Sequence, residues 1–239
     1  MTDLILGKVS FAYHKKPILV GVEAQFKAGS LTALVGLNGT GKSTCLKLAA
    51  GLLTAKQGSV CFSDGTDFDD RQHRTRRIAY LPQFQPVAWA LACRDIVRLG
   101  RVPYGEDEAA VLAAMQFCDV AHFADMAIDT ISGGEQARVL LARVLAGAAD
   151  IYLLDEPVRS LDLRRQVQVM ALLKAQARMG KAVVIVLHDL SLAARFCDEV
   201  VLLNEQSIIQ QGAPQSVFTA QQLHSIFGVE MDMVWNKSA

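Results

Sequence analysis

Cysteine, proline and long hydrophobic runs are all scarce in this sequence, and each scarcity excludes a class of protein. The five cysteines are odd in number and form no CxxC pair, which predicts neither a disulfide framework nor a cysteine metal site and favours reduced thiols in a cytosolic protein. With 6 prolines, 17 glycines and 20% charged residues, the chain has the composition of neither a disordered protein nor a collagen.

Signals for the membrane and for secretion are also missing. The longest aliphatic run, residues 182–187, is about a third of the ~20 residues that a membrane-spanning helix needs. The first residues lack a basic region followed by a long apolar one, so no signal peptide is expected. Any membrane role is therefore expected to come through a partner.

Neither sign of charge is in excess, because 24 Lys and Arg balance 24 Asp and Glu. Without an overall field that attracts a polyanion, nucleic acid is not expected as a partner. The 239 residues, 51% of them hydrophobic, are enough for one large domain with its own core.

The sequence does contain short apolar runs separated by helical patterns. Brief runs without alternation predict buried strands of a mainly parallel sheet, here at residues 31–35, 151–154, 183–187 and 200–203. Residues 86–149 have helical spacing and predict an inserted α-helical subdomain, and residues 3–30 alternate like antiparallel strands. We therefore expect an α/β fold in one domain, residues 1–239, with a core formed by residues 1–85 and 150–239.

The most informative motif is residues 36–44, Gly-Leu-Asn-Gly-Thr-Gly-Lys-Ser-Thr. It matches the phosphate-binding P-loop and lies between a predicted strand and an apolar helix, a context that disfavours a plain glycine-rich turn. The glycines allow the loop to curl so that backbone N–H groups face one cavity at a helix N-terminus. Lys42 is expected to neutralise the β- and γ-phosphates of a nucleotide, and the Ser43 hydroxyl to bind Mg²⁺.

Two acidic residues, Asp155 and Glu156, follow the apolar run at residues 151–154. At the end of a strand beside a P-loop, Asp155 is expected to hold Mg²⁺ and Glu156 to polarise the water that attacks the γ-phosphate. Alone, such a pair could equally be a solvated strand end.

A second glycine-rich site, Ser132-Gly133-Gly134-Glu135, precedes an apolar helix expected at residues 137–145. Ser132 and Glu135 fit a capping box. The two glycines leave bare N–H groups at the helix start, where an anion can bind.

Taken in order, the P-loop, the Ser132-Gly133-Gly134 helix start and the Asp155-Glu156 pair resemble the ATP-binding cassette (ABC) transporter ATPases over nearly the whole chain. The resemblance implies a P-loop NTPase core of the RecA-like kind and hydrolysis of ATP with Mg²⁺. It also implies that two cassettes pair head to tail, so that each ATP lies between one P-loop and the other protomer's Ser132-Gly133-Gly134.

The resemblance assigns further residues. Gln83 is similar to a loop glutamine that touches Mg²⁺ and the attacking water, and His188 to a switch histidine on the γ-phosphate. The residues that it places on the nucleotide are Tyr13, Gly36, Asn38, Gly39, Thr40, Gly41, Lys42, Ser43, Thr44 and, across the dimer, Ser132, Gly133, Gly134, Glu135 and Asp162.

Two positions depart from the family pattern. Glu135 replaces a usual glutamine and still completes the capping box. Arg159 stands in Val158-Arg159-Ser160, where small polar residues are common, and its guanidinium could form a charge-assisted contact or merely reach solvent.

Residues 94–103 and 187–195 resemble the ATPases of bacterial importers for iron–siderophore complexes, haem and cobalamin. This implies a homodimer on the cytoplasmic side of the inner membrane, bound to permease subunits and served indirectly by an extracytoplasmic binding protein. Residues 85–101 are expected to form the groove for the permease, with Val87, Trp89 and Leu91 exposed and Arg94, Arg98 and Arg101 at the rim.

An exporter ATPase and a soluble ABC ATPase that acts in translation or DNA repair remain as alternatives, since the hydrolytic motifs do not encode direction. A GTPase is disfavoured because no Asn-Lys-x-Asp motif is present. Neither the cargo nor the role of residues 206–239 follows from the sequence.

Overall fold

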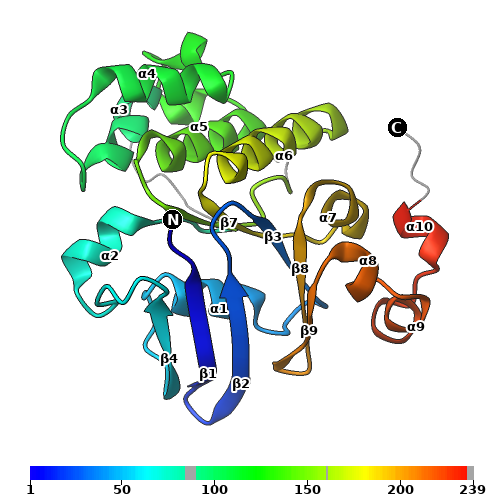
Figure 1. The fold of residues 1–239 in the computed structure, drawn as a ribbon. Coiled ribbons are helices and arrows are strands. Elements are labelled where there is room, and N and C mark those ends of the chain that lie inside the picture. Colours follow the sequence, from blue (N-terminus) through cyan, green and yellow to red (C-terminus); the bar gives the residue numbers. More distant parts are fainter. Residues whose placement is uncertain (84–89, 160, 236–239) are drawn as a thin grey trace.

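The computed structural model describes residues 1–83, 90–159 and 161–235 (Figure 1). Its strands are β1 (Leu4–Tyr13), β2 (Lys16–Phe26), β3 (Leu31–Val35), β4 (Gln57–Phe62), β5 (Ile78–Leu81), β6 (Ile151–Asp155), β7 (Ala182–Val186), β8 (Glu199–Asn204) and β9 (Ser207–Gly212). Its α-helices are α1 (Lys42–Ala49), α2 (Arg71–Arg77), α3 (Cys93–Arg98), α4 (Glu108–Phe117), α5 (Gly133–Ala146), α6 (Leu163–Arg178), α7 (Leu190–Phe196), α8 (Pro214–Val217), α9 (Ala220–Gln222) and α10 (Met231–Trp235). Short 3₁₀ turns η1 (Leu99–Arg101), η2 (Ala121–Phe123) and η3 (Ile128–Thr130) and a π turn η4 (Leu223–Phe227) join them.

The central sheet has six strands in the order β5-β6-β7-β3-β8-β9, parallel except for β9. Every residue of β3, β6 and β7 is buried, because helices or a second sheet cover both faces. Alternate residues enter two cores: Ala33 and Ile185 pack toward α5 and α6, while Leu34 and Val184 pack toward α1 and the antiparallel strands. The expected α/β class with a mainly parallel sheet is confirmed.

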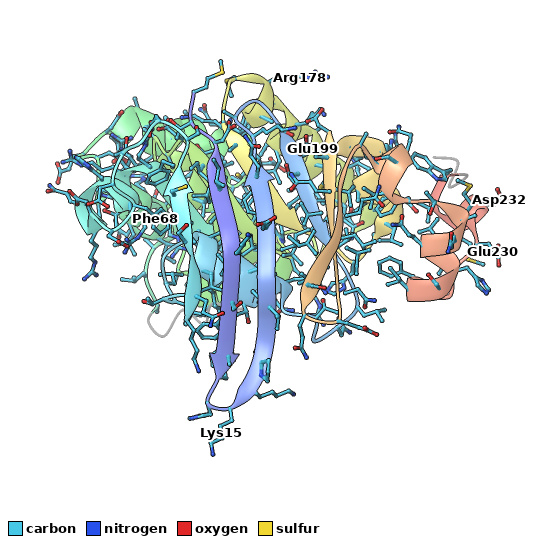
Figure 2. All side chains as sticks on the ribbon, turned by 60° about the horizontal axis from the view of Figure 1, so that its bottom comes forward. Lys15, Phe68, Arg178, Glu199, Glu230 and Asp232 are labelled. Carbon is cyan, nitrogen blue, oxygen red and sulfur yellow. The ribbon has the colours of Figure 1, made fainter. Side chains whose placement is uncertain are left out.

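The antiparallel sheet has the order β2-β1-β4. It packs on the α1 side of the central sheet through Leu4, Leu6 and Phe26, each at most 1% exposed. The β1–β2 hairpin projects from the body of the molecule, with Lys15 at its tip (Figure 2). Antiparallel strands in residues 3–30 were expected and are present.

Helices α3, α4 and α5 form the expected inserted subdomain between β5 and β6 (Figure 1). Helix α5 begins at Gly133, four residues before the expected residue 137, since the Ser132–Glu135 capping box starts the helix earlier. The backbone of Gly100 packs directly against the backbone of α5. A Cβ atom at this position would lie 1.8 Å from the Arg143 carbonyl oxygen, so a larger residue would clash.

The last part of the chain closes the core beside α7. β9 adds an antiparallel edge to β8, and α10 packs against α7, with Val234 5% exposed and the Ser191 hydroxyl donating to the Met233 carbonyl oxygen at 3.2 Å. Within the described ranges, no helix has both the length and the apolar character to cross a bilayer.

Candidate functional site

The expected site residues converge because of the strand order. β6, β7 and β3 are adjacent and parallel, so their carboxyl ends meet at one edge of the sheet, where α/β proteins bind ligands. The P-loop follows β3, Asp155 ends β6 and Glu156 follows it, and His188 follows β7.

The P-loop needs glycine at two positions for steric reasons. Gly36 has φ 154° and a Cβ there would lie 2.1 Å from the Leu203 carbonyl oxygen. Gly41 has φ 103° and a Cβ would lie 2.8 Å from a methyl of Leu19. Both distances are too short for any side chain, so these glycines let the loop lie against β8 and β2.

Lys42 lies inside the loop rather than in solvent. Its side chain donates to the carbonyl oxygens of Gly36 and Leu37, both at 2.8 Å, and the residue is 6% exposed. Burial lowers the pKa of Lys42, although the nearby carboxylates of Glu156 and Asp155 oppose this effect. The loop thus curls around the Lys42 ammonium.

Asp155 is 2% exposed and lies beside the first turn of α1. Burial raises the pKa of this carboxyl, and a hydrogen bond from the Ser43 hydroxyl opposes the rise. Its Oδ1 atom has no hydrogen-bond partner among the described residues. A buried carboxylate oxygen without a partner next to a hydroxyl is a donor set that fits Mg²⁺.

The protein alone supplies only part of such a metal site. In the described portion of the chain, no three His, Cys, Asp or Glu side chains gather into a metal-binding group.

The Glu156 side chain is buried, with 7% of its surface exposed, and several neighbouring side chains bond to it. Oε1 lies 2.6 Å from Nε2 of His188, and Oε2 accepts from Nη1 of Arg159 at 3.1 Å. Burial raises the pKa of Glu156, but the bonds and charges of His188, Arg159 and Gln83 outweigh it, so the pKa is lowered. The group is therefore an ionised carboxylate at neutral pH.

The backbone of Glu156 is also unusual. Its φ of 54° lies in the left-handed region, which is costly for a residue with a Cβ atom. This conformation turns the chain sharply at the end of β6, at the point where the carboxylate meets His188.

Three predicted motifs are not joined to this cluster by any hydrogen bond among the described residues. Ser132 and Glu135 bond to each other, with Ser132 N donating to Glu135 Oε2 at 2.7 Å, and Asp162 accepts from Arg165 N at 2.9 Å as the N-cap of α6. Tyr13, 44% exposed near the hairpin tip, packs edge-on against the Phe11 ring, with 4.9 Å between the ring centroids. A single chain therefore gives these residues local capping and packing contacts.

The contact between Arg159 and Glu156 was left open by the sequence. An arginine three residues after a carboxylate was the available signal, yet a charge-assisted contact and exposure to solvent were equally compatible with it. The structure has the ion pair.

Part of the expected permease groove lies outside the described residues, including residues 85–89 with Val87 and Trp89, as does Ser160. Leu91 was expected to be exposed but is half-buried against the core. Arg94 and Arg98 form ion pairs with neighbouring carboxylates, and Leu99 is 53% exposed.

Known proteins resemble this chain in sequence. The sequence model of the ABC transporter family matches residues 19–159. The hemin import ATP-binding protein HmuV of Streptomyces coelicolor is 44% identical over 89% of this chain and 78% of its own length. The HmuV of Rhodococcus jostii is 37% identical over 92% and 77%. The cobalamin import ATP-binding protein BtuD of Halobacterium salinarum is 40% identical over 88% of this chain but only 55% of its own.

Solved structures share the fold. A metal-chelate type ABC transporter in an inward-facing conformation superposes with a TM-score of 0.82 at 25% identity, covering 96% of this chain and 90% of that one. A dimeric bacterial ABC transporter cassette gives 0.77 at 25% identity, covering 88% and 98%. A bacterial Atm1-family exporter with ATP bound gives 0.81 at 26% identity, covering 90% of this chain and 39% of that one.

Proposed function

Because the chain belongs to the ABC transporter family, we propose that it is the ATP-hydrolysing subunit of an importer for hemin, cobalamin or a similar metal complex. It binds ATP and is an ATPase of this family. The observation that carries the catalytic part is the meeting of Lys42, Asp155, Glu156 and His188 at the carboxyl ends of β3, β6 and β7. Import is supported by relatives whose names specify import of hemin and cobalamin.

Binding begins at the P-loop. Its N–H groups and the α1 N-terminus receive the phosphates, and Lys42 exchanges its two carbonyl partners for phosphate oxygens. Ser43 and the free Oδ1 of Asp155 would hold Mg²⁺, which supplies charge neutralisation at the β- and γ-phosphates.

Hydrolysis requires a proton acceptor, and Glu156 is the ionised carboxylate in place. It accepts a proton from the water that attacks the γ-phosphate, with Gln83 beside it. His188 is 42% exposed, so its ring can leave Glu156 and donate to a γ-phosphate oxygen.

A dimer completes the site. The bare N–H groups at Gly133 and Gly134 are exposed or half-buried at the start of α5, where a γ-phosphate held by the P-loop of a second copy can reach them. ATP then binds the closed pair better than the open one, and hydrolysis reverses this preference. The similarity to a dimeric cassette supports this arrangement.

The membrane partner is proposed to be a permease, which would keep the subunit at the cytoplasmic face of the membrane. Exposed apolar residues near the described end of the expected groove, Leu99 at 53% and Val102 at 75%, support a protein partner on this side.

Glu156→Gln tests the catalytic assignment. The amide keeps the shape of the carboxylate but cannot accept a proton, so hydrolysis should fall by at least about a hundredfold while ATP affinity stays within about twofold. ATP should also shift the variant from monomer to dimer in light scattering. Glu205→Gln is the matched control, because Glu205 is an exposed glutamate with φ 45° outside the site. Parental turnover in Glu156→Gln would remove Glu156 from catalysis.

The direction and cargo need a cellular test, since the chain resembles an exporter cassette almost as well in shape. Deletion of the gene should abolish growth on hemin as the sole iron source, or on cobalamin in a strain that depends on external cobalamin. Normal uptake of both, with accumulation of haem or lipid inside the cell, would instead support the exporter alternative.

A further inference from the structure

Arg159 takes no part in the proposed binding of ATP or in the proton transfer, yet its side chain donates a hydrogen bond to the proposed proton acceptor, Glu156. We propose that Arg159 is a positioning residue: its guanidinium holds the Glu156 carboxylate at the end of β6 in the orientation from which it accepts the proton of the attacking water. The role rests on the proposed function, because it has meaning only if Glu156 is the acceptor.

The two oxygens of the Glu156 carboxylate have different partners. Oε1 meets His188 Nε2 at 2.6 Å, and Oε2 accepts from Arg159 Nη1 at 3.1 Å. A carboxylate bonded through both oxygens cannot rotate about its last torsion without breaking one bond, so the pair of contacts fixes its plane.

The backbone brings Arg159 back over Glu156. Arg159 N donates to the Glu156 carbonyl oxygen at 3.3 Å, and the loop is anchored by Val158, 5% exposed, whose carbonyl oxygen accepts from Gln166 Nε2 at 3.2 Å. The guanidinium therefore extends from a fixed turn, although its own side chain is 65% exposed.

A cavity lies beside the Glu156 carboxylate and the Arg159 guanidinium. It has a volume of about 180 Å³ and is lined by Glu156, Arg159, Gln166, His188 and Leu192 among others. Arg159 thus forms one wall of the space next to Glu156 rather than a contact on the far side of the molecule.

Arg159 differs from His188 in one respect that decides its role. The Arg159 guanidinium has no other ion-pair partner among the described residues. When His188 turns to the γ-phosphate, Glu156 loses one of its two strongest contacts. Arg159 then remains, with the Gln83 side chain, to hold the carboxylate in place.

The test compares Arg159→Ala, Arg159→Lys and the matched control Arg164→Ala by steady-state hydrolysis of Mg²⁺-ATP. Arg164 is exposed and lies five residues along, and its side chain makes no hydrogen bond or ion pair with the described residues. In Arg159→Ala, kcat should fall about tenfold with KM within about twofold, because only the orientation of the acceptor is lost. Arg159→Lys should recover at least half of the lost rate, and Arg164→Ala should match the parent.

A coupling measurement separates positioning from general support of the loop. In the Glu156→Gln background, Arg159→Ala should change the residual single-turnover rate by less than about twofold, since there is no carboxylate left to orient. An equal additional loss in that background would overturn the role, as would a parental or increased kcat in Arg159→Ala, or a lysine variant no better than alanine.

Failure of the proposed function has a different signature. If the parent does not hydrolyse ATP, or if Glu156→Gln keeps the parental rate, the catalytic assignment itself is wrong. If the parent hydrolyses ATP and depends on Glu156, but Arg159→Ala keeps the parental kcat, only the positioning role of Arg159 is wrong. Thermal unfolding midpoints of all variants confirm that they are folded.

Discussion

The ammonium of Lys42 is bound to two carbonyl oxygens of the loop that it will serve. Most lysines extend into water and lose rotamer freedom when they bind a phosphate. Lys42 is held by these two bonds, and burial disfavours its charge. We therefore expect this side chain to lose little further rotamer freedom when it binds the proposed phosphates.

Lys42→Ala should weaken ATP binding roughly ten- to hundredfold, because a hydrogen bond to a charged group contributes about 1.5–3 kcal/mol. Titration calorimetry with Mg²⁺-ATP measures the change. Lys181→Ala is the control, since Lys181 pairs with Asp150 at the amino end of β7, away from the loop. Parental affinity in Lys42→Ala would contradict the P-loop assignment.

The cysteines give a second prediction at this scale. Cys61 is exposed, whereas burial raises the pKa of Cys45, Cys118 and Cys197 to about 12 and raises that of Cys93. Because the thiolate is the reactive form, Ellman's reagent should modify one thiol rapidly in the folded protein and the other four only after unfolding. Cys61→Ser should remove the rapid phase. Rapid modification of two or more thiols would contradict the burial.

Which elements could be predicted depended on burial. β3, β6, β7 and β8 lie deep in the sheet and read as uninterrupted apolar runs, so the residues that follow them could be assigned to one edge. β4 and β9 are mostly exposed or half-buried, and their mixed residues carry no such run. The bond between His188 and Glu156 depends on β6 lying beside β7, which no local pattern encodes.

At the scale of elements, Asp119 joins the helical subdomain to the core. Its Oδ2 accepts from Arg138 of α5 at 3.2 Å and from Arg165 of α6 at 2.7 Å, and Arg138 also donates to the Asp119 carbonyl oxygen at 2.7 Å. The same carboxylate thus bonds to the helix capped by Ser132 and to the helix capped by Asp162. A rotation of the subdomain against the core would have to stretch the bond between Asp119 and Arg165.

Asp119→Asn should weaken the contact between the helical subdomain and α6 while lowering the global stability of the protein only slightly. Asparagine tolerates the φ of 54° found there, and exposed ion pairs contribute only about 0–1 kcal/mol each. Hydrogen exchange should therefore quicken at the start of α6 and in the loop after α4, while the thermal midpoint falls by only a few degrees at most. Asp125→Asn, which removes an 86% exposed partner of Arg94, should leave that exchange unchanged. Equal exchange in both variants would show that Asp119 does not couple the helices.

At the scale of the whole molecule, Arg77 connects segments that are far apart in the sequence. It donates to Asp64 Oδ2 at 2.6 Å, to the Thr2 hydroxyl at 2.5 Å and to Asp150 Oδ2 at 3.4 Å. These contacts link the amino terminus, the turn after β4, the end of α2 and the start of β6. The bond from Arg77 holds the pKa of Asp64 well below its usual range.

A carboxyl with a lowered folded-state pKa stabilises the protein above the unfolded pKa of about 4, and this contribution is lost as the pH falls toward the folded value. Urea unfolding should therefore show that Asp64→Asn is less stable than the parent at about pH 7, and that the difference shrinks by about pH 3. Asp129→Asn, at an exposed residue, is the control. A stability difference that is constant across this pH range would contradict the contribution of the Asp64 charge.

The left-handed backbone at Glu156 has an evolutionary consequence. Glycine and asparagine adopt this conformation more easily than glutamate, so either residue at position 156 would relieve the backbone strain while removing the proposed proton acceptor. Selection for stability and selection for turnover therefore favour different residues at this position. In a randomised library screened only for soluble expression, glutamate at position 156 should be depleted, and only a screen for ATP-driven growth should retain it.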